Sequence, residues 1–109
     1  MMITGDERRL RGMLGFAMRA GKIVIGTETV CKAMASKLPP KLVVIASDVS
    51  AGTLKKLVTK CEFYNIKSVR ISIGADELGD LLGKTYSPAT VGIMDEGFAE
   101  QIIRVTTIT

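Results

Sequence analysis

The sequence predicts a single α/β domain in which a mixed sheet of about four strands lies between layers of helices. Short apolar runs rich in β-branched residues alternate with segments whose apolar residues recur at helical spacing. Residues 42–46 are apolar throughout, which is typical of a strand covered on both faces. A chain of 109 residues is long enough for one core and short for two. We therefore expect residues 1–109 to form one three-layer α-β-α sandwich.

Five segments have the pattern of amphipathic helices. In the first, Leu10, Leu14 and Ala17 share one face, and Gly21 follows as a stop signal. A fourth helix is opened by Asp76 and Glu77, whose charges suit a helix start. The first helix is expected at residues 6–20, and the remaining three at residues 28–36, 51–64 and 97–104.

Four short segments are the expected strands. The expected strands span residues 23–25, 42–46, 67–71 and 90–94, and loops are expected at residues 47–50 and 72–75. The last residues, 105–109, are β-branched and are compatible with either a short strand or a frayed tail.

Charge is distributed unevenly along the chain. The formal net charge is +4, but residues 1–70 carry +8 and residues 71–109 carry −4. Such segregation favours a basic face that meets nucleic acid. The alternative is that lysines and arginines coat exposed helix faces without binding anything.

Compartment and assembly follow from what the sequence lacks. It contains no apolar run of the length that spans a membrane, and its first residues are charged where a signal peptide would be apolar. Cys31 and Cys61 lie in apolar helical patterns, so we interpret them as reduced core residues. We expect a cytoplasmic protein, and a monomer because no long apolar surface is evident.

Catalytic motifs are missing. The chain has no histidine, no phosphate-binding glycine loop and no nucleophile elbow. The acidic cluster Asp76, Glu77 and Asp80 fits a helix start better than an acid–base or metal site. We therefore predict that the protein is not an enzyme and holds no cofactor or metal.

The stretch from Gly21 to Lys32 is the strongest candidate site. A short strand turns at Gly26 directly into a helix, and Thr27 is the expected N-cap. Glycine allows another backbone to approach, and a helix start attracts anions. Lys22 and Lys32 flank the site and suit a phosphate backbone. An ordinary strand-to-helix turn with solvated lysines is the alternative.

These residues resemble the superfamily of small kink-turn RNA-binding ribosomal proteins, the L7Ae and L30e type. Four blocks in the same order carry the likeness: residues 21–27 with Lys32 and Ala33, residues 41–48, residues 77–79 with Gly83 and Lys84, and residues 91–95. Further motifs resemble the bacterial YlxQ-type branch: residues 14–19, 60–64 and 95–99.

The resemblance implies an α-β-α sandwich, no catalysis, and RNA binding through two adjacent loops. The first loop holds Gly26, Thr27, Glu28, Thr29 and Lys32, and the second holds Ser72, Ile73, Gly74 and Ala75. In the family, the position of Glu28-Thr29 carries a polar pair, such as Asn-Glu or Lys-Gln, that reads sheared G·A base pairs. Ile73 either packs on an extruded base or lies tucked under the fourth helix.

The sequence therefore predicts a binder of structured RNA, ribosomal or otherwise linked to translation. Arg8 and Arg11 are further candidates for phosphate contacts. The unusual pair Glu28-Thr29 motivates an alternative, a protein–protein adaptor on the same scaffold with weakened or lost RNA binding. A third reading, an enzyme acting on a small phosphorylated ligand at Gly26 and Thr27, has the least support.

Overall fold

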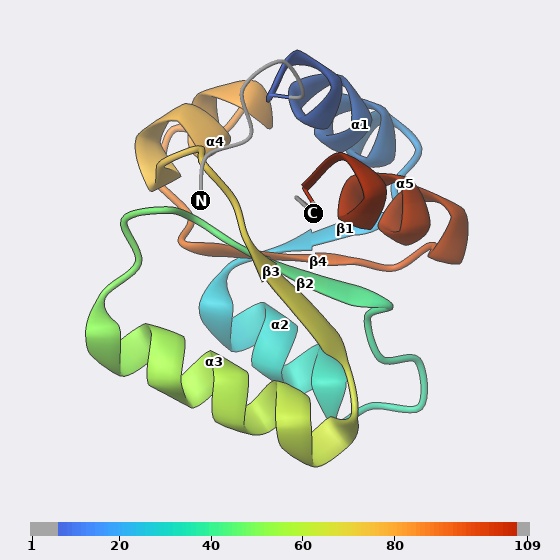
Figure 1. Cartoon of the computed structure of the whole chain (residues 1–109), viewed down its shortest axis with the longest axis vertical. Coiled ribbons are helices and arrows are strands. Elements are labelled where there is room, and N and C mark those ends of the chain that lie inside the picture. The colour runs from blue at the N-terminus through green and yellow to red at the C-terminus, as the bar shows by residue number, and fades with distance from the viewer. Residues whose placement is uncertain (1–6, 107–109) are drawn as a thin grey trace.

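A four-stranded mixed sheet forms the middle layer of the structure, a computed structural model that describes residues 7–106 (Figure 1). The strands lie in the order β1-β4-β2-β3, with β4 antiparallel to both β1 and β2, and β3 parallel to β2. Their bounds are Ile23–Ile25 for β1, Leu42–Ile45 for β2, Lys67–Arg70 for β3 and Thr90–Ile93 for β4.

Helices cover both faces of this sheet, which confirms the expected α-β-α sandwich (Figure 1). One face carries α1 (Glu7–Arg19), α4 (Ala75–Leu81) and α5 (Glu96–Thr106). The other face carries α2 (Thr27–Met34) and α3 (Ala51–Tyr64), which contact each other.

The strand directions bring several connections to one edge of the sheet. Because β1 and β2 both run antiparallel to β4, and β3 runs parallel to β2, the first three strands point the same way. They end at Ile25, Ile45 and Arg70, where β4 begins at Thr90. We call this the carboxyl edge. The connections to α2, α3 and α4 all start there: one residue separates β1 from α2, whereas residues 46–50 and 71–74 precede α3 and α4.

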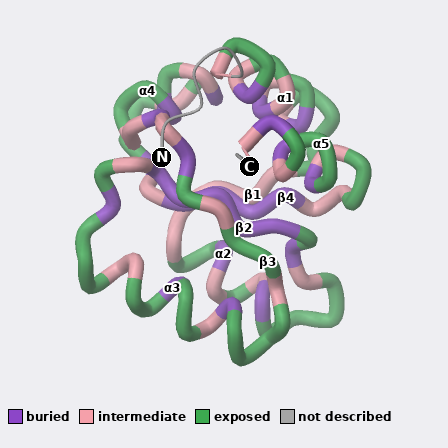
Figure 2. Tube along the Cα trace, viewed as in Figure 1, coloured by how far each residue is buried: buried purple, intermediate pink, exposed green. Residues whose placement is uncertain are grey.

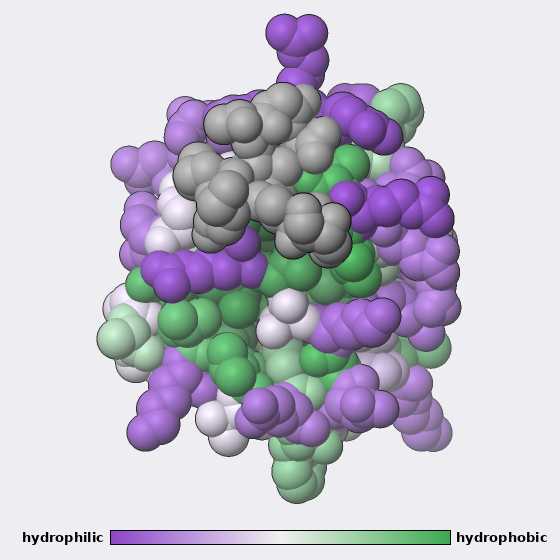
Figure 3. All heavy atoms as spheres, viewed as in Figure 1, coloured by the Kyte–Doolittle hydropathy of each residue, from purple (hydrophilic) through white to green (hydrophobic). Residues whose placement is uncertain are grey.

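Two clusters of buried side chains hold the layers together. The larger cluster lies between the sheet and α1, α4 and α5, and includes Leu14 and Ile102. The smaller lies between the sheet and the α2–α3 pair, and includes Val30 and Leu57. Figure 2 shows β2 and β4 buried along their lengths. Hydrophilic side chains surround the apolar ones in the view of Figure 3.

The structure moves some predicted boundaries. The bounds of β1 and α3 are confirmed, whereas α2 starts one residue earlier than predicted and ends at Met34. Val105 and Thr106 continue α5, so the expectation of a strand or frayed tail is wrong for these two residues. Asp6 and residues 107–109 lie outside the described residues.

The remaining expectations about the chain have mixed outcomes. In α3, Leu57 and Cys61 are buried, whereas Val58 is 37% exposed. Cys61 and the half-buried Cys31 are both free, and burial raises the pKa of the Cys61 thiol above its ordinary value. Among residues 7–106, no helix is long and apolar enough to cross a membrane.

Candidate nucleic-acid interface

The junction between β1 and α2 is a turn made by one residue, Gly26. Its φ of 105° lies in a region that L side chains rarely adopt. The Gly26 N–H donates to the Thr90 carbonyl at 2.9 Å, which extends the pairing of β1 with β4 by one residue. The helix therefore begins immediately at the carboxyl edge, without an intervening loop.

Thr27 is not the N-cap that the sequence predicts. Gly26 occupies the cap position, and Thr27 is the first helical residue. The Thr27 hydroxyl lies 2.9 Å from the hydroxyl of Thr90, whose side chain is fully buried. Because the glycine turn brings the helix start against β4, this hydroxyl satisfies a buried polar partner and does not cap the helix.

The amino end of α2 consequently remains open. The first backbone hydrogen bond of the helix is donated by Val30 to the Gly26 carbonyl, at 2.9 Å. Within the described residues, no side chain accepts from the N–H groups of Thr27, Glu28 and Thr29. Open donors and the helix dipole favour an anion at this position.

Polar side chains surround this open end. Glu28 and Thr29 are exposed on the first turn, and Lys32 is exposed one turn further along. The Thr29 hydroxyl lies 3.8 Å from the position that a Cβ on Gly26 would take, so it stands beside the junction. The structure thus brings together five predicted site residues: Gly26, Thr27, Glu28, Thr29 and Lys32.

The second predicted loop also reaches the carboxyl edge, but its polar groups are used within the protein. The Ser72 hydroxyl donates to Glu7 Oε1 at 3.1 Å, and the Ile73 carbonyl accepts from Ser47 N–H at 2.9 Å. Gly74 caps α4, and the N–H of Ala75 donates to Asp48 Oδ1 at 2.9 Å.

Ile73 cannot pack on an extruded base in this structure. Its side chain is fully buried in the larger core cluster, together with Leu78 of α4. Of the two readings of Ile73, the structure confirms the one that tucks it under α4. Apolar side chains at a loop are drawn into a nearby core because burial removes their surface from water.

Lys22 is separated from the other candidate residues. It precedes β1, so it lies at the edge opposite to Gly26, and its carbonyl accepts from Met94 N–H at 2.8 Å. A strand rises about 3.3 Å per residue, so the three residues of β1 hold Lys22 roughly 10 Å or more from the junction.

The arginines of α1 occupy the opposite layer. Arg11 donates to Glu77 Oε2 at 2.7 Å and to Glu7 Oε2 at 3.2 Å. The hydrogen bond to Glu77 is the main cause that raises the pKa of Arg11, and the two carboxylates compensate its charge. Arg8 is exposed on the same helix. Neither arginine lies in the layer of α2.

The segment between α4 and β4 is a part of the carboxyl edge that the sequence reasoning missed. The Ala89 carbonyl accepts from Ala46 N–H at 2.9 Å, so this segment lies between the two predicted loops. A Cβ on Gly79 would overlap the Tyr86 carbonyl oxygen, so glycine lets the segment pack on α4. Tyr86 itself is 54% exposed. The available signal was Gly79, a glycine within a helical pattern.

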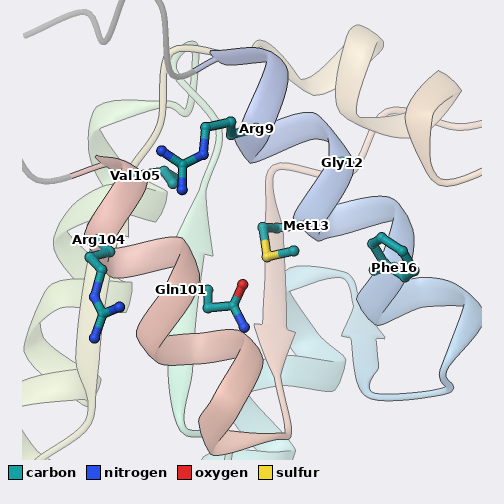
Figure 4. Close-up of a pocket in the computed structure, with 7 residues that line it drawn as sticks. All are labelled: Arg9, Gly12, Met13, Phe16, Gln101, Arg104 and Val105. Atoms are coloured by element: carbon teal, nitrogen blue, oxygen red, sulfur yellow. The ribbon is translucent and has the colours of Figure 1, made fainter.

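A separate recess of about 360 Å³ lies between α1 and α5, in the layer opposite α2. In Figure 4, Met13 and Gln101 point toward each other across the gap, and Arg9 reaches toward Val105. This recess does not include any residue of the junction. Among the described residues, no group of three His, Cys, Asp or Glu side chains is arranged to hold a metal ion.

Comparison with known proteins identifies the family. The model of the Ribosomal protein L7Ae/L30e/S12e/Gadd45 family matches residues 8–103. The chain belongs to this family. The resemblance to the L7Ae and L30e type, and to its YlxQ branch, is therefore confirmed.

Two relatives named RNA-binding protein YlxQ are similar over most of their lengths. The chain is 33% identical to that of Enterococcus faecium, covering 92% of this chain and 93% of the relative. It is 35% identical to that of Bacillus subtilis, covering 84% and 88%. A large ribosomal subunit protein eL30 from Sulfurisphaera tokodaii is 32% identical, covering 87% and 85%.

Solved structures agree with this assignment. A Bacillus halodurans protein of unknown function has a TM-score of 0.81 and 31% identity, covering 89% of this chain and 95% of that one. A 15.5 kDa RNA-binding protein from Giardia lamblia has a TM-score of 0.75 and 16% identity, covering 93% and 84%. The second likeness supports the L7Ae-like fold.

Proposed function

We propose that this member of the L7Ae/L30e family binds structured RNA at the amino end of α2 and catalyses no reaction. Family membership and the names of the YlxQ relatives support RNA as the ligand. The RNA is ribosomal or linked to translation, as the similarity to eL30 supports. We expect a cytoplasmic monomer.

The observation that carries this proposal is the open start of α2. Three N–H groups without a partner among the described residues, a glycine that exposes the backbone and the exposed ammonium of Lys32 lie within about two helical turns. Such a group suits the phosphate backbone of RNA, since it combines hydrogen-bond donors with positive charge. The side chains of Glu28 and Thr29 would then face the bases.

The RNA feature that we assign to this site is a kink-turn or a related fold with sheared G·A pairs. The Glu28 carboxylate accepts hydrogen bonds from base amino groups, and the Thr29 hydroxyl both donates and accepts. Both are exposed at the position where family members carry the polar pair that reads these bases. Ser72, Gly74 and Ala75 are neighbours at the same edge and would border the RNA.

A salt-titrated binding assay tests the proposal. It compares a kink-turn RNA with the same RNA in which the sheared G·A pairs are replaced by Watson–Crick pairs. We expect tight binding to the first RNA, weaker binding to the second, and affinities that fall as salt rises. Equal affinity for both RNAs would remove the assignment to kink-turns, and no binding to either would overturn RNA binding at this site.

Lys32→Glu locates the contact, with Lys41→Glu as the matched control. Both residues are exposed lysines, but Lys41 precedes β2 and lies at the edge opposite to the α2 start. The two variants change the net charge equally. We expect Lys32→Glu to weaken binding at least tenfold and Lys41→Glu to have a small effect. Equal losses would show that only net charge matters.

A further inference from the structure

The helices α2 and α3 run side by side in the same direction. Each begins at the carboxyl edge, after β1 and β2 respectively, and each ends at the opposite edge before the next strand. The two helices contact each other and form one layer (Figure 1). The helix α3 has 14 residues and α2 has 8, and in the view of Figure 1 α3 extends past the start of α2.

Three exposed lysines lie on these two helices. Lys32 is the sixth residue of α2, and Lys55 and Lys56 are the fifth and sixth residues of α3. A rise of 1.5 Å per residue puts all three roughly 6–8 Å from the helix starts. Packed helices have axes about 8–10 Å apart. Lys55 and Lys56 thus lie in the first half of the helix that packs beside α2.

These lysines have no acidic partners. Within the described residues, none of Lys32, Lys55 and Lys56 forms an ion pair. The helices of this layer carry four basic and two acidic residues, and those of the opposite layer carry five basic and six acidic residues. The acidic residues of the α2–α3 layer are Glu28, which lies one turn before Lys32 on the same face of α2, and Glu62, which lies near the end of α3, six residues from Lys56.

We propose that Lys55 and Lys56 bind the phosphate backbone of an RNA stem that continues from the open end of α2, so that the RNA lies across both helices. This inference rests on the function proposed above. The α2 junction would contact the irregular part of the RNA, and α3 would hold the adjoining duplex without reading its sequence. Lysines suit that role because they bind phosphates as point charges.

The test compares two double variants, Lys55→Gln with Lys56→Gln and Lys41→Gln with Lys67→Gln. The second is the matched control, since it also removes two exposed lysines but at the opposite edge, where they precede β2 and begin β3. The ligands are a kink-turn RNA with two long stems and two shortened forms, each with one stem cut back. Binding is measured over a fourfold range of salt.

For the long RNA, we expect loss of Lys55 and Lys56 to reduce the slope of log affinity against log salt by about 2. The advantage of the wild type then grows roughly tenfold as salt is lowered fourfold. Cutting back one stem should abolish this difference, and cutting back the other should preserve it. The control should match the wild type on every RNA.

Three outcomes would overturn the inference. The first is a variant lacking Lys55 and Lys56 that binds the long RNA as the wild type does. The second is a difference that survives in both shortened RNAs, which would exclude a contact with a stem. The third is an equal loss in the control. In all three the wild type binds RNA, whereas failure of the wild type to bind would instead defeat the proposed function.

Discussion

The starts of α2 and α4 lie at the same edge of the sheet, yet they differ in what their N–H groups can do. At α4, the Asp48 carboxylate accepts from the N–H of Ala75, and two acidic residues follow in the first turn. At α2, the Thr27 hydroxyl is committed to Thr90, and the N–H groups of the first turn stay open. The comparison teaches that the chain itself already occupies one helix start and leaves the other available.

This difference favours the junction at Gly26 over the loop at residues 72–75 as the proposed RNA contact. The loop at residues 72–75 contributes a buried isoleucine and hydrogen bonds within the protein. The junction at Gly26 contributes donors that need an external acceptor. The sequence resemblance predicts both segments as binding loops. The hydrogen-bond partners of their polar groups distinguish a loop that stabilises the fold from one that can bind a ligand.

The largest effect on stability is expected at the two glycines that precede these helices. Gly26→Ala should lower the free energy of unfolding by about 2 kcal/mol, because φ is 105° there. Gly74→Ala should cost less, because its φ of −77° suits any residue and the new Cβ would lie 3.3 Å from Asp48 Oδ2. Urea denaturation measures both. Equal losses would contradict the strained turn at Gly26.

A smaller loss of stability is expected at the buried hydroxyl pair. Thr27→Val should cost about 1–2 kcal/mol, because it leaves the buried Thr90 hydroxyl without its partner. Thr27→Ser keeps the hydroxyl and is the control. Combining Thr27→Val with Thr90→Val should recover part of the lost stability. Thermal unfolding measures the stability of the two single variants and of the double variant. A serine variant as unstable as the valine variant would count against the hydrogen bond.

Removing the side-chain cap of α4 should lower the free energy of unfolding by about 1 kcal/mol. Asp48→Ala removes the acceptor for the N–H of Ala75, and loss of a helix cap has this size. RNA affinity should not fall, because α4 is not the proposed contact. Chemical denaturation and the RNA-binding assay together check the two expectations. A large loss of affinity in a folded Asp48→Ala protein would move the site toward α4.

The smallest effect is expected at Lys22. Lys22→Glu should weaken RNA binding much less than Lys32→Glu, because β1 separates Lys22 from the junction, whereas Lys32 lies in the second turn of α2. The same binding assay compares the two variants at one salt concentration. Comparable losses would show that the RNA reaches the opposite edge of the sheet.

Local patterns were sufficient to predict most of the fold. The strand at residues 23–25 and the helix at residues 51–64 have the predicted bounds, because apolar spacing and turn residues fix such elements locally. The end of the chain was misread because the β-branched Val105 and Thr106 favour strands, whereas in the structure Val105 packs in the larger core cluster as part of α5.

The site was less predictable because its properties depend on distant partners. Thr27 looks like a cap until Thr90, far along the chain, takes its hydroxyl. Asp48 caps α4 from 27 positions away, which no local pattern signals. The prediction that Lys22 belongs to the site was a different kind of error. Lys22 precedes β1, so the sequence alone already placed it at the end of that strand opposite to Gly26.

The most direct test of the open helix start follows backbone amides by NMR while a kink-turn RNA is added. We predict large chemical-shift changes for the amides of Thr27, Glu28 and Thr29, and slower exchange of their protons with solvent. The amide of Ala75, already bonded to Asp48, should change little. Large changes at Ala75 with none at the start of α2 would contradict the account.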